Sequence, residues 1–361
     1  MGKIRVCLLS RYPPHEGGIA THAKALADGL RKKGHEVTLI TYGRLGRKED
    51  GIRIIEVPTV NLFFARGLSY LIGTVLALRK LKGSIDVIHA HPIHPAGTAA
   101  VISKRFSGTP VVITSHGSDL EKWAKKPFGR FLFSKVSNSA DALICVSSVL
   151  ADLAKGIGIE ENKIRVVPNG IEMPAPFGSA DKALLREKLG LPAGKKMVLY
   201  VGMLEDIKNP QELLRCAELL SNYIFVFVGG GRLEDELRMC ARRNGLGNVR
   251  FEGMKGHDVA LEYMRAADLL VVPSKFEGFG LSALEGMALG TPVVAKPAGA
   301  LKDLLAKESL TDDLMSKISE VLENQMLSNT IVRKNMEIAK KFDVSRMVDG
   351  IEKVYEEVCK Q

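Results

Sequence analysis

Two glutamates eight residues apart, Glu277 and Glu285, carry the strongest chemical signal in the sequence. They lie in the segment 273–295, PSKFEGFGLSALEGMALGTPVVA, where a Gly-Phe-Gly tripeptide precedes a predicted helix. The first N–H groups of a helix have no partner within it, so they can face a phosphate. Carboxylates on either side can accept hydrogen bonds from sugar or ribose hydroxyls. Solvated surface carboxylates are the alternative, which the surrounding glycines and apolar residues disfavour.

Three further loops follow predicted strands and carry residues that can hold a phosphate or a sugar. Gly17 and Gly18 precede a helix, and glycine lets the backbone approach a phosphate closely. Lys208 follows a strand that ends at Gly202, and its ammonium group could neutralise a diphosphate. His116 directly follows another strand and could bond a sugar hydroxyl or carry charge near neutral pH. A plain turn, a solvated lysine and a structural histidine are the respective alternatives.

Other motifs in the chain argue against common cofactors. His89, His91 and His94 resemble metal ligands superficially, but no carboxylate is interleaved with them, so no metal site is predicted. The glycines 229–231 lack the spacing of a dinucleotide motif, which disfavours a nicotinamide cofactor. The five cysteines are scattered, and residues 1–10 lack the pattern of a secretory signal. Both features predict a cytoplasmic protein with reduced cysteines.

The charge of the chain is unevenly distributed. The formal net charge is +10, of which residues 1–170, with 25 basic and 13 acidic side chains, contribute +12. This asymmetry indicates an anionic partner for the first half, and a membrane surface and a phosphorylated substrate are both compatible with it. Nucleic acid is not predicted, because the sequence contains no recognition motif for it.

The predicted secondary structure alternates apolar strands with helices in two successive series. This pattern is typical of doubly wound α/β domains, and 361 residues suit two domains of roughly 100–200 residues each. A segment rich in Pro and Gly, 166–178, marks the linker. We predict domains over 1–170 and 171–342, followed by a helix over 343–361. Ligands of such sheets bind outside the carboxyl ends of the strands, where the loops described above lie.

A basic and aromatic stretch, residues 121–138, is a candidate for contact with the acceptor or a membrane. It can lie on an anionic membrane surface, although an amphipathic core helix is the alternative. The uncharged residues 67–78 are too short to span a bilayer, which needs ~20 apolar residues. We therefore predict a peripheral protein at the inner face of the membrane with a glycan or lipid-linked acceptor. The residues singled out are Lys122, Trp123, Lys125, Lys126 and Arg130.

Taken together, these segments resemble the retaining GT-B glycosyltransferases, the large Glu-x7-Glu group of mannosyl-, glucosyl- and N-acetylglucosaminyltransferases. The resemblance runs over nearly the whole chain, from GGIATHAKALADGL to EGFGLSALEGMALGTPVVA. It implies two Rossmann-like domains that face each other across a cleft, with the helix 343–361 returning to the first domain. It also implies transfer from a UDP- or GDP-linked sugar to a hydroxyl acceptor with retention, without a metal or another cofactor.

The resemblance assigns roles to individual residues. It implies that Glu285 holds the donor ribose and that Lys208 neutralises the diphosphate. It implies that Glu277 holds the donor sugar and that His116 lies beside that sugar at the reacting face. The remaining donor-binding set that it implies is Gly17, Gly18, Gly202, Gly253, Met254, Gly278, Phe279, Gly280 and Leu281.

Two departures from the family pattern keep other functions open. Met203 stands where relatives carry an arginine that shares the diphosphate with Lys208, and Arg232 is a candidate substitute. The segment after Ala295 is short, so we expect one phosphate-side loop and the last strand of the sheet to be missing. The alternatives are a nucleotide-sugar epimerase on the same architecture and a non-catalytic binding protein that kept the fold.

Overall fold

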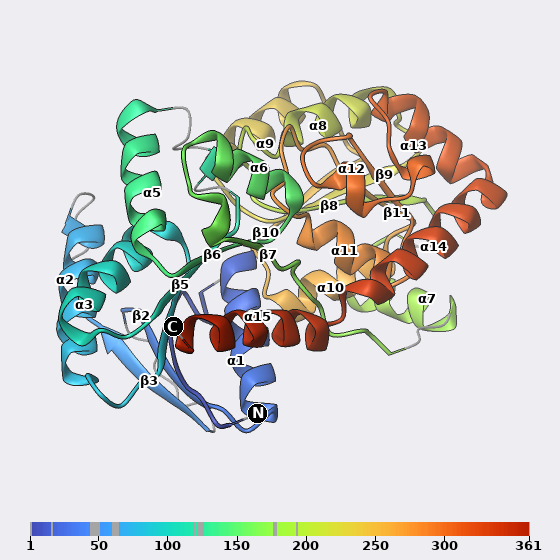
Figure 1. The fold of residues 1–361 in the computed structure, drawn as a ribbon. Coiled ribbons are helices and arrows are strands. Elements are labelled where there is room, and N and C mark those ends of the chain that lie inside the picture. Colours follow the sequence, from blue (N-terminus) through green and yellow to red (C-terminus); the bar gives the residue numbers. More distant parts are fainter. Residues whose placement is uncertain are drawn as a thin grey trace. The chain divides into compact units, whose positions relative to one another are not determined.

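The computed structural model describes residues 2–15, 17–43, 51–59, 65–117, 120–121, 126–175, 179–192 and 194–360. The chain forms two compact units (Figure 1). Unit 1 comprises Met1–Glu172 and Val344–Gln361, and unit 2 comprises Met173–Asp343. The sequence analysis placed the two boundaries after residues 170 and 342, close to the observed divisions after Glu172 and Asp343.

Unit 1 contains a parallel seven-stranded sheet in the order β3-β2-β1-β4-β5-β6-β7. Its strands are rich in Val, Ile and Leu and are mostly buried, as parallel strands covered on both faces must be. The strand order reverses between β1 and β4, which makes this pair the switch point of the sheet. The strands are β1 (Arg5–Leu9), β2 (Glu36–Tyr42), β3 (Ile52–Val57), β4 (Val87–Ala90), β5 (Val111–Ser115), β6 (Ala142–Cys145) and β7 (Ile164–Val166).

The final helix, α15 (Val344–Cys359), packs on α1 (Gly18–Lys32) inside unit 1. Val348 occupies the space that a side chain at Gly29 would need, so the two helices approach closely. The other helices of the unit are α2 (Ala65–Lys80), η1 (Ile93–Gly97), α3 (Thr98–Ser107), α5 (Pro127–Ser139), α6 (Ser148–Gly156) and η2 (Glu161–Lys163).

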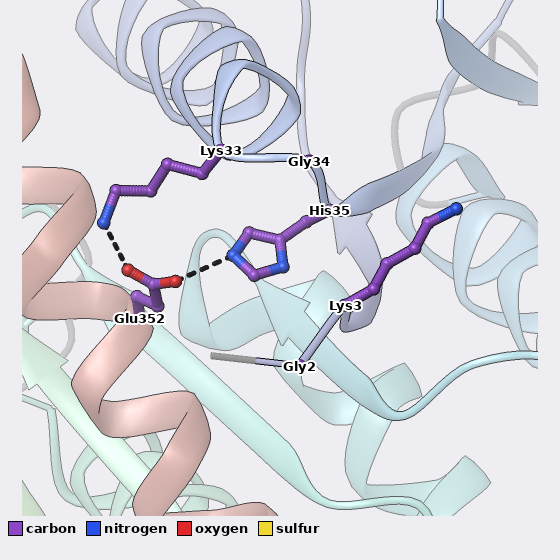
Figure 2. Close-up of a pocket in the computed structure, with 6 residues that line it drawn as sticks. All are labelled: Gly2, Lys3, Lys33, Gly34, His35 and Glu352. Carbon is purple, nitrogen blue, oxygen red and sulfur yellow. Dashed lines mark hydrogen bonds and ion pairs between the residues drawn. The ribbon is translucent and has the colours of Figure 1, made fainter.

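Ion pairs hold α15 against the end of α1 (Figure 2). Lys33 pairs with both Asp349 and Glu352, and the His35 ring lies 2.9 Å from the Glu352 carboxylate. A shallow hollow of about 350 Å³ opens beside these pairs. The pairs of Lys33 with Asp349 and Glu352 place this hollow along the contact between α15 and the end of α1. Its lining residues are Gly2, Lys3, Lys33, Gly34, His35 and Glu352.

Unit 2 contains a parallel five-stranded sheet in the order β10-β9-β8-β11-β12, whose switch point lies between β8 and β11. The strands are β8 (Met197–Val201), β9 (Ile224–Val228), β10 (Val249–Gly253), β11 (Leu269–Val272) and β12 (Val293–Ala295). The helices are α7 (Ser179–Lys188), α8 (Pro210–Leu219), α9 (Glu234–Arg243), α10 (His257–Ala266), α11 (Leu281–Ala288), α12 (Leu301–Leu304), η3 (Lys307–Ser309), α13 (Leu314–Glu323), α14 (Gln325–Ala339) and η4 (Lys340–Phe342).

The last strand expected after β12 is reduced rather than absent. Leu310 forms an isolated parallel bridge with Ala295, and the Thr311 N–H donates to the Ala295 carbonyl at 3.0 Å. The short helices α12 and η3 fill the interval between β12 and this bridge. The expectation that the strand is missing was therefore wrong in part: a single residue continues the sheet.

Candidate functional site

An ion pair spans the switch point of unit 2. The Lys208 Nζ atom, in the loop after β8, lies 2.7 Å from Glu277 Oε1, in the loop after β11. The Ser274 hydroxyl donates to the same oxygen at 2.8 Å. Glu277 is buried, with 6% of its surface exposed, so its charge requires these partners. The structure thus brings two of the predicted site residues into direct contact.

The two loops that carry this pair are tied to each other. The turn before α8 ends at Asn209, which has a left-handed backbone (φ 53°) and directly precedes Pro210, the first residue of the helix. The Asn209 side chain donates to the Pro273 carbonyl at 3.2 Å. The Lys275 N–H donates to the Ile207 carbonyl at 2.9 Å. These bonds fix the lysine loop against the glutamate loop before any ligand binds.

The backbone at Gly299, in the loop after β12, packs directly against the backbone of Glu277. Its φ is +55°, and a Cβ atom there would lie 2.2 Å from the Glu277 carbonyl oxygen. The neighbouring Ala300 N–H donates to that carbonyl at 2.9 Å. Only glycine therefore fits between the two loops.

We expect Gly299→Ala to lower the free energy of unfolding by about 2 kcal/mol and kcat/KM about tenfold, because the new methyl group must displace the Glu277 loop. Urea unfolding and initial rates measure the two effects. Gly290→Ala is the matched control, since Gly290 has φ +72° but no backbone atom close to the place where a Cβ atom would lie. The control should retain its activity, and equal loss of activity in both variants would contradict the prediction.

Glu285, the second predicted carboxylate, contacts a residue that the sequence analysis missed. The His257 Nε2 atom, in the first residue of α10, lies 2.8 Å from Glu285 Oε1 on α11. The hydrogen bond to Glu285 raises the pKa of His257 above its ordinary value of 6.5, and the Coulomb attraction of the same carboxylate adds to this. No motif signals this pair, because the two residues come from different helices.

We expect donor binding to tighten as the pH rises, because a donor ribose on Glu285 would displace His257. The raised pKa means that the contribution of the pair to stability is fully present below pH 6.5 and is lost as the pH rises through the raised pKa. Calorimetry between about pH 6 and pH 8.5 should show tighter donor binding at the higher pH and, at the lower pH, the release of a proton from His257 on binding. His257→Asn should abolish both effects. A donor affinity that does not change with pH in the parent protein would contradict the prediction.

The other predicted donor-side residues of unit 2 lie at neighbouring strand ends. The Gly202 N–H donates to the Val228 carbonyl at 3.1 Å, and the Gly229 N–H donates to the Gly253 carbonyl at 2.9 Å. The loops after β8, β9 and β10 are therefore adjacent. Met254 is half-exposed beside them. The start of α11 carries the remaining predicted residues, Gly278, Phe279, Gly280 and Leu281.

The end of β5 in unit 1 carries His116, which belongs to a cluster of histidines. Its Nε2 atom lies 3.1 Å from Nδ1 of His91, and its ring packs edge-on against His22. Burial lowers the pKa of His22 to about 4 and that of His116 and His91 well below 6.5. These surroundings favour the neutral ring, and of the two predicted roles for His116 they are compatible with a hydrogen bond to a sugar hydroxyl, which stays a prediction.

The same three rings are the one group of His, Cys, Asp or Glu that could hold a metal ion within the described ranges. One nitrogen from each of His22, His91 and His116 lies within 4.8 Å of the other two. His89 bonds Tyr355 and Thr114 instead, at 2.6 and 2.7 Å. That no metal is needed stays a prediction.

The remaining predicted residues of unit 1 lie at two helix starts. Gly17 (φ 112°) caps α1, and Gly18 is the first residue of that helix. Lys126 is exposed and caps α5, and Arg130 on the same helix donates to the Gly156 carbonyl at 2.6 Å. Three of the predicted acceptor or membrane residues lie outside the described residues, namely Lys122, Trp123 and Lys125.

Comparison with known proteins decides the family. Residues 16–173 match the family model of Glycosyltransferase Family 4, and residues 181–341 match that of Glycosyl transferases group 1. An uncharacterised glycosyltransferase of Methanocaldococcus jannaschii is 30% identical, over 98% of this chain and 99% of that protein. The chain belongs to the GT-B glycosyltransferases. This glycosyltransferase is also 33% identical to a D-inositol 3-phosphate glycosyltransferase of Catenulispora acidiphila, over 79% of the chain and 76% of the relative.

Solved structures share the fold of this glycosyltransferase. Anabaena HepE in complex with UDP and glucose superimposes with a TM-score of 0.85 at 21% identity, covering 98% of this chain and 99% of that one. The two parallel sheets, one in each unit, are thus those of a GT-B enzyme, as the sequence predicted.

Proposed function

We propose that this glycosyltransferase moves a sugar from a UDP- or GDP-linked donor to a hydroxyl group of a glycan or lipid-linked acceptor, with retention at the anomeric carbon. The Lys208–Glu277 pair carries the proposal, because it lies at the switch point where open α/β sheets bind ligands. HepE structures that hold UDP with glucose, or UDP-glucose, support a uridine nucleotide.

The proposed reaction needs little covalent work from the protein. The bond between the anomeric carbon and the diphosphate oxygen breaks, and a bond to the acceptor oxygen forms on the same face. The leaving phosphate takes the acceptor proton. Catalysis then rests on positioning and on stabilising the charge that grows on the diphosphate.

Each group in unit 2 has a proposed part in this step. Lys208 turns from Glu277 to the diphosphate, which leaves Glu277 free to accept bonds from the donor sugar. Glu285 accepts bonds from the ribose hydroxyls. The loop at Gly253 contacts the base, and the backbone from Gly278 to Leu281 contacts the sugar. For unit 1 we propose the roles that the family resemblance gives: the 17–18 loop at the phosphates and neutral His116 beside the sugar.

Arg232 is our proposed substitute for the arginine that Met203 replaces. Its guanidinium pairs with Asp206, which lies in the same turn as Lys208. Both partners are more than half-exposed, and such surface pairs contribute little, so the arginine can exchange Asp206 for a diphosphate at small cost.

Calorimetry with UDP, GDP and a panel of their sugars, followed by turnover with a simple acceptor, tests the proposal. We expect one nucleotide class to bind at a single site and the product to keep the anomeric configuration of the donor, as read by NMR. An inverted product, or no nucleotide binding, contradicts it. An isomerised sugar nucleotide would indicate the epimerase, and tight binding without turnover would indicate the non-catalytic protein.

We expect EDTA to leave the transfer rate unchanged, because Lys208 and the start of α11 supply the positive potential that a divalent cation provides in other enzymes. Initial rates before and after dialysis against EDTA, with metal content measured in parallel, check this. A loss of activity that Zn²⁺ or Mg²⁺ restores would contradict this prediction. The cluster of His22, His91 and His116 would then be the first candidate for the metal site.

A further inference from the structure

Three neighbouring helices of unit 1 form a surface with an unusual charge. Helices α2, α3 and α5 lie on one side of the unit (Figure 1), where α3 contacts both of the others. The described side chains of these helices include six basic residues and no acidic residue. The basic residues are Arg79, Lys80, Lys104, Arg105, Arg130 and Lys135.

The outward side of α2 is apolar, where a surface helix normally carries polar residues. Leu68, Ile72 and Leu76 recur every fourth residue, so they share one face of the helix, and they are 60%, 50% and 55% exposed. The opposite side of α2 is buried through Tyr70 and Leu78. This opposite side of α2 therefore faces the core, whereas the outer stripe leaves at least half of each of its three side chains exposed.

The adjoining helices extend this apolar surface. Ile102 on α3 and Phe128 and Phe131 on α5 are exposed. By contrast Phe133, in the same basic and aromatic stretch 121–138, is buried in the unit. Lys135 lies 5.7 Å from the centre of the Phe131 ring, a cation–π arrangement. Apolar groups and cations thus occur side by side on the same surface.

Three cations of this surface are available to a partner. Arg79, Lys80 and Arg105 are exposed, and no described carboxylate pairs with them, whereas Lys104 pairs with Asp141 at 2.7 Å. An anionic lipid surface complements both properties, because acyl chains accept the apolar stripe while headgroups attract the cations. A protein partner would have to supply a matching acidic and apolar face.

We propose that the α2–α3–α5 surface docks on an anionic membrane, with α2 lying in the plane of the interface. Within the described part of the chain, no helix combines the length and apolarity that crossing a bilayer requires. The proposal extends the function above, because docking would present a lipid-linked acceptor. It is tested without a donor, so that either proposal can fail alone.

Co-sedimentation with vesicles tests the docking. The full chain is mixed with phosphatidylcholine vesicles, with or without about 30% phosphatidylglycerol, and we expect at least about fivefold more binding to the anionic ones. The triple variant Leu68→Ser/Ile72→Ser/Leu76→Ser should lose at least about fivefold of that binding. The matched control replaces three exposed residues of unit 2, Leu184→Ser/Leu219→Ser/Met326→Ser, and should bind like the parent.

Several outcomes would overturn the docking proposal. These are equal recovery in the supernatant with both vesicle types, and undiminished binding of the triple variant. A parent dimer that the triple variant converts to a monomer, by light scattering, would show that the surface binds a second copy instead. Circular dichroism and thermal unfolding of the variant report its folding. If it does not fold, Arg79→Gln/Lys80→Gln/Arg105→Gln should still lose the preference for anionic vesicles.

Discussion

Replacing Lys208 by alanine should lower kcat/KM for sugar transfer by at least about a hundredfold. The ammonium group is the cation nearest to Glu277, and the proposed diphosphate position lies at the same switch point. Without it, the negative charge that grows on the leaving diphosphate meets only helix N–H groups and Arg232. Initial rates at several donor concentrations measure the loss.

The same substitution should also destabilise unit 2, by about 3–5 kcal/mol, because it leaves the buried Glu277 carboxylate without its cation. The double variant Lys208→Ala/Glu277→Gln should regain most of this stability while its activity stays low. That comparison separates catalysis from folding. Lys275→Ala is the control, since Lys275 is an exposed lysine two residues from Glu277. Full activity of the Lys208→Ala protein would remove the lysine from the proposed mechanism.

Replacing Glu285 by alanine should weaken donor binding by at least about 100-fold and leave the fold intact. Two ribose hydroxyls would lose a charged acceptor, and each hydrogen bond to a charged group contributes about 1.5–3 kcal/mol. The carboxylate is mostly buried at its contact with His257. Calorimetry with the preferred nucleotide sugar measures the change.

Two further readouts make the test of Glu285 specific. In the Glu285→Ala protein the pKa of His257 should fall back toward 6.5, which NMR titration of the ring detects. Glu262→Ala is the matched control, because Glu262 on α10 also pairs with a cation, Lys188, at 2.6 Å. It should leave donor affinity unchanged. Unaltered donor binding in the Glu285→Ala protein would exclude the ribose role.

The sequence alone determined the alternating architecture and the loops in which the candidate site lies. Apolar strand periodicity and turn residues are local properties, so β8, β9 and β11 and the glycines that follow them were predictable. The rule that ligands bind at strand ends then placed Lys208 and Glu277 at one edge of a sheet. The family motif added their proposed roles.

Tertiary structure decided which side chains meet, because contacts between separate elements leave no periodic trace in a sequence. The contact of His257 with Glu285 depends on how α10 packs beside α11. Burial and the neighbouring histidine rings lower the pKa of His116, and the amino-acid composition alone does not reveal that environment. Likewise the sequence marked 67–78 only as an uncharged stretch. Its division into a buried side and an exposed apolar stripe follows from the surface on which α2 packs.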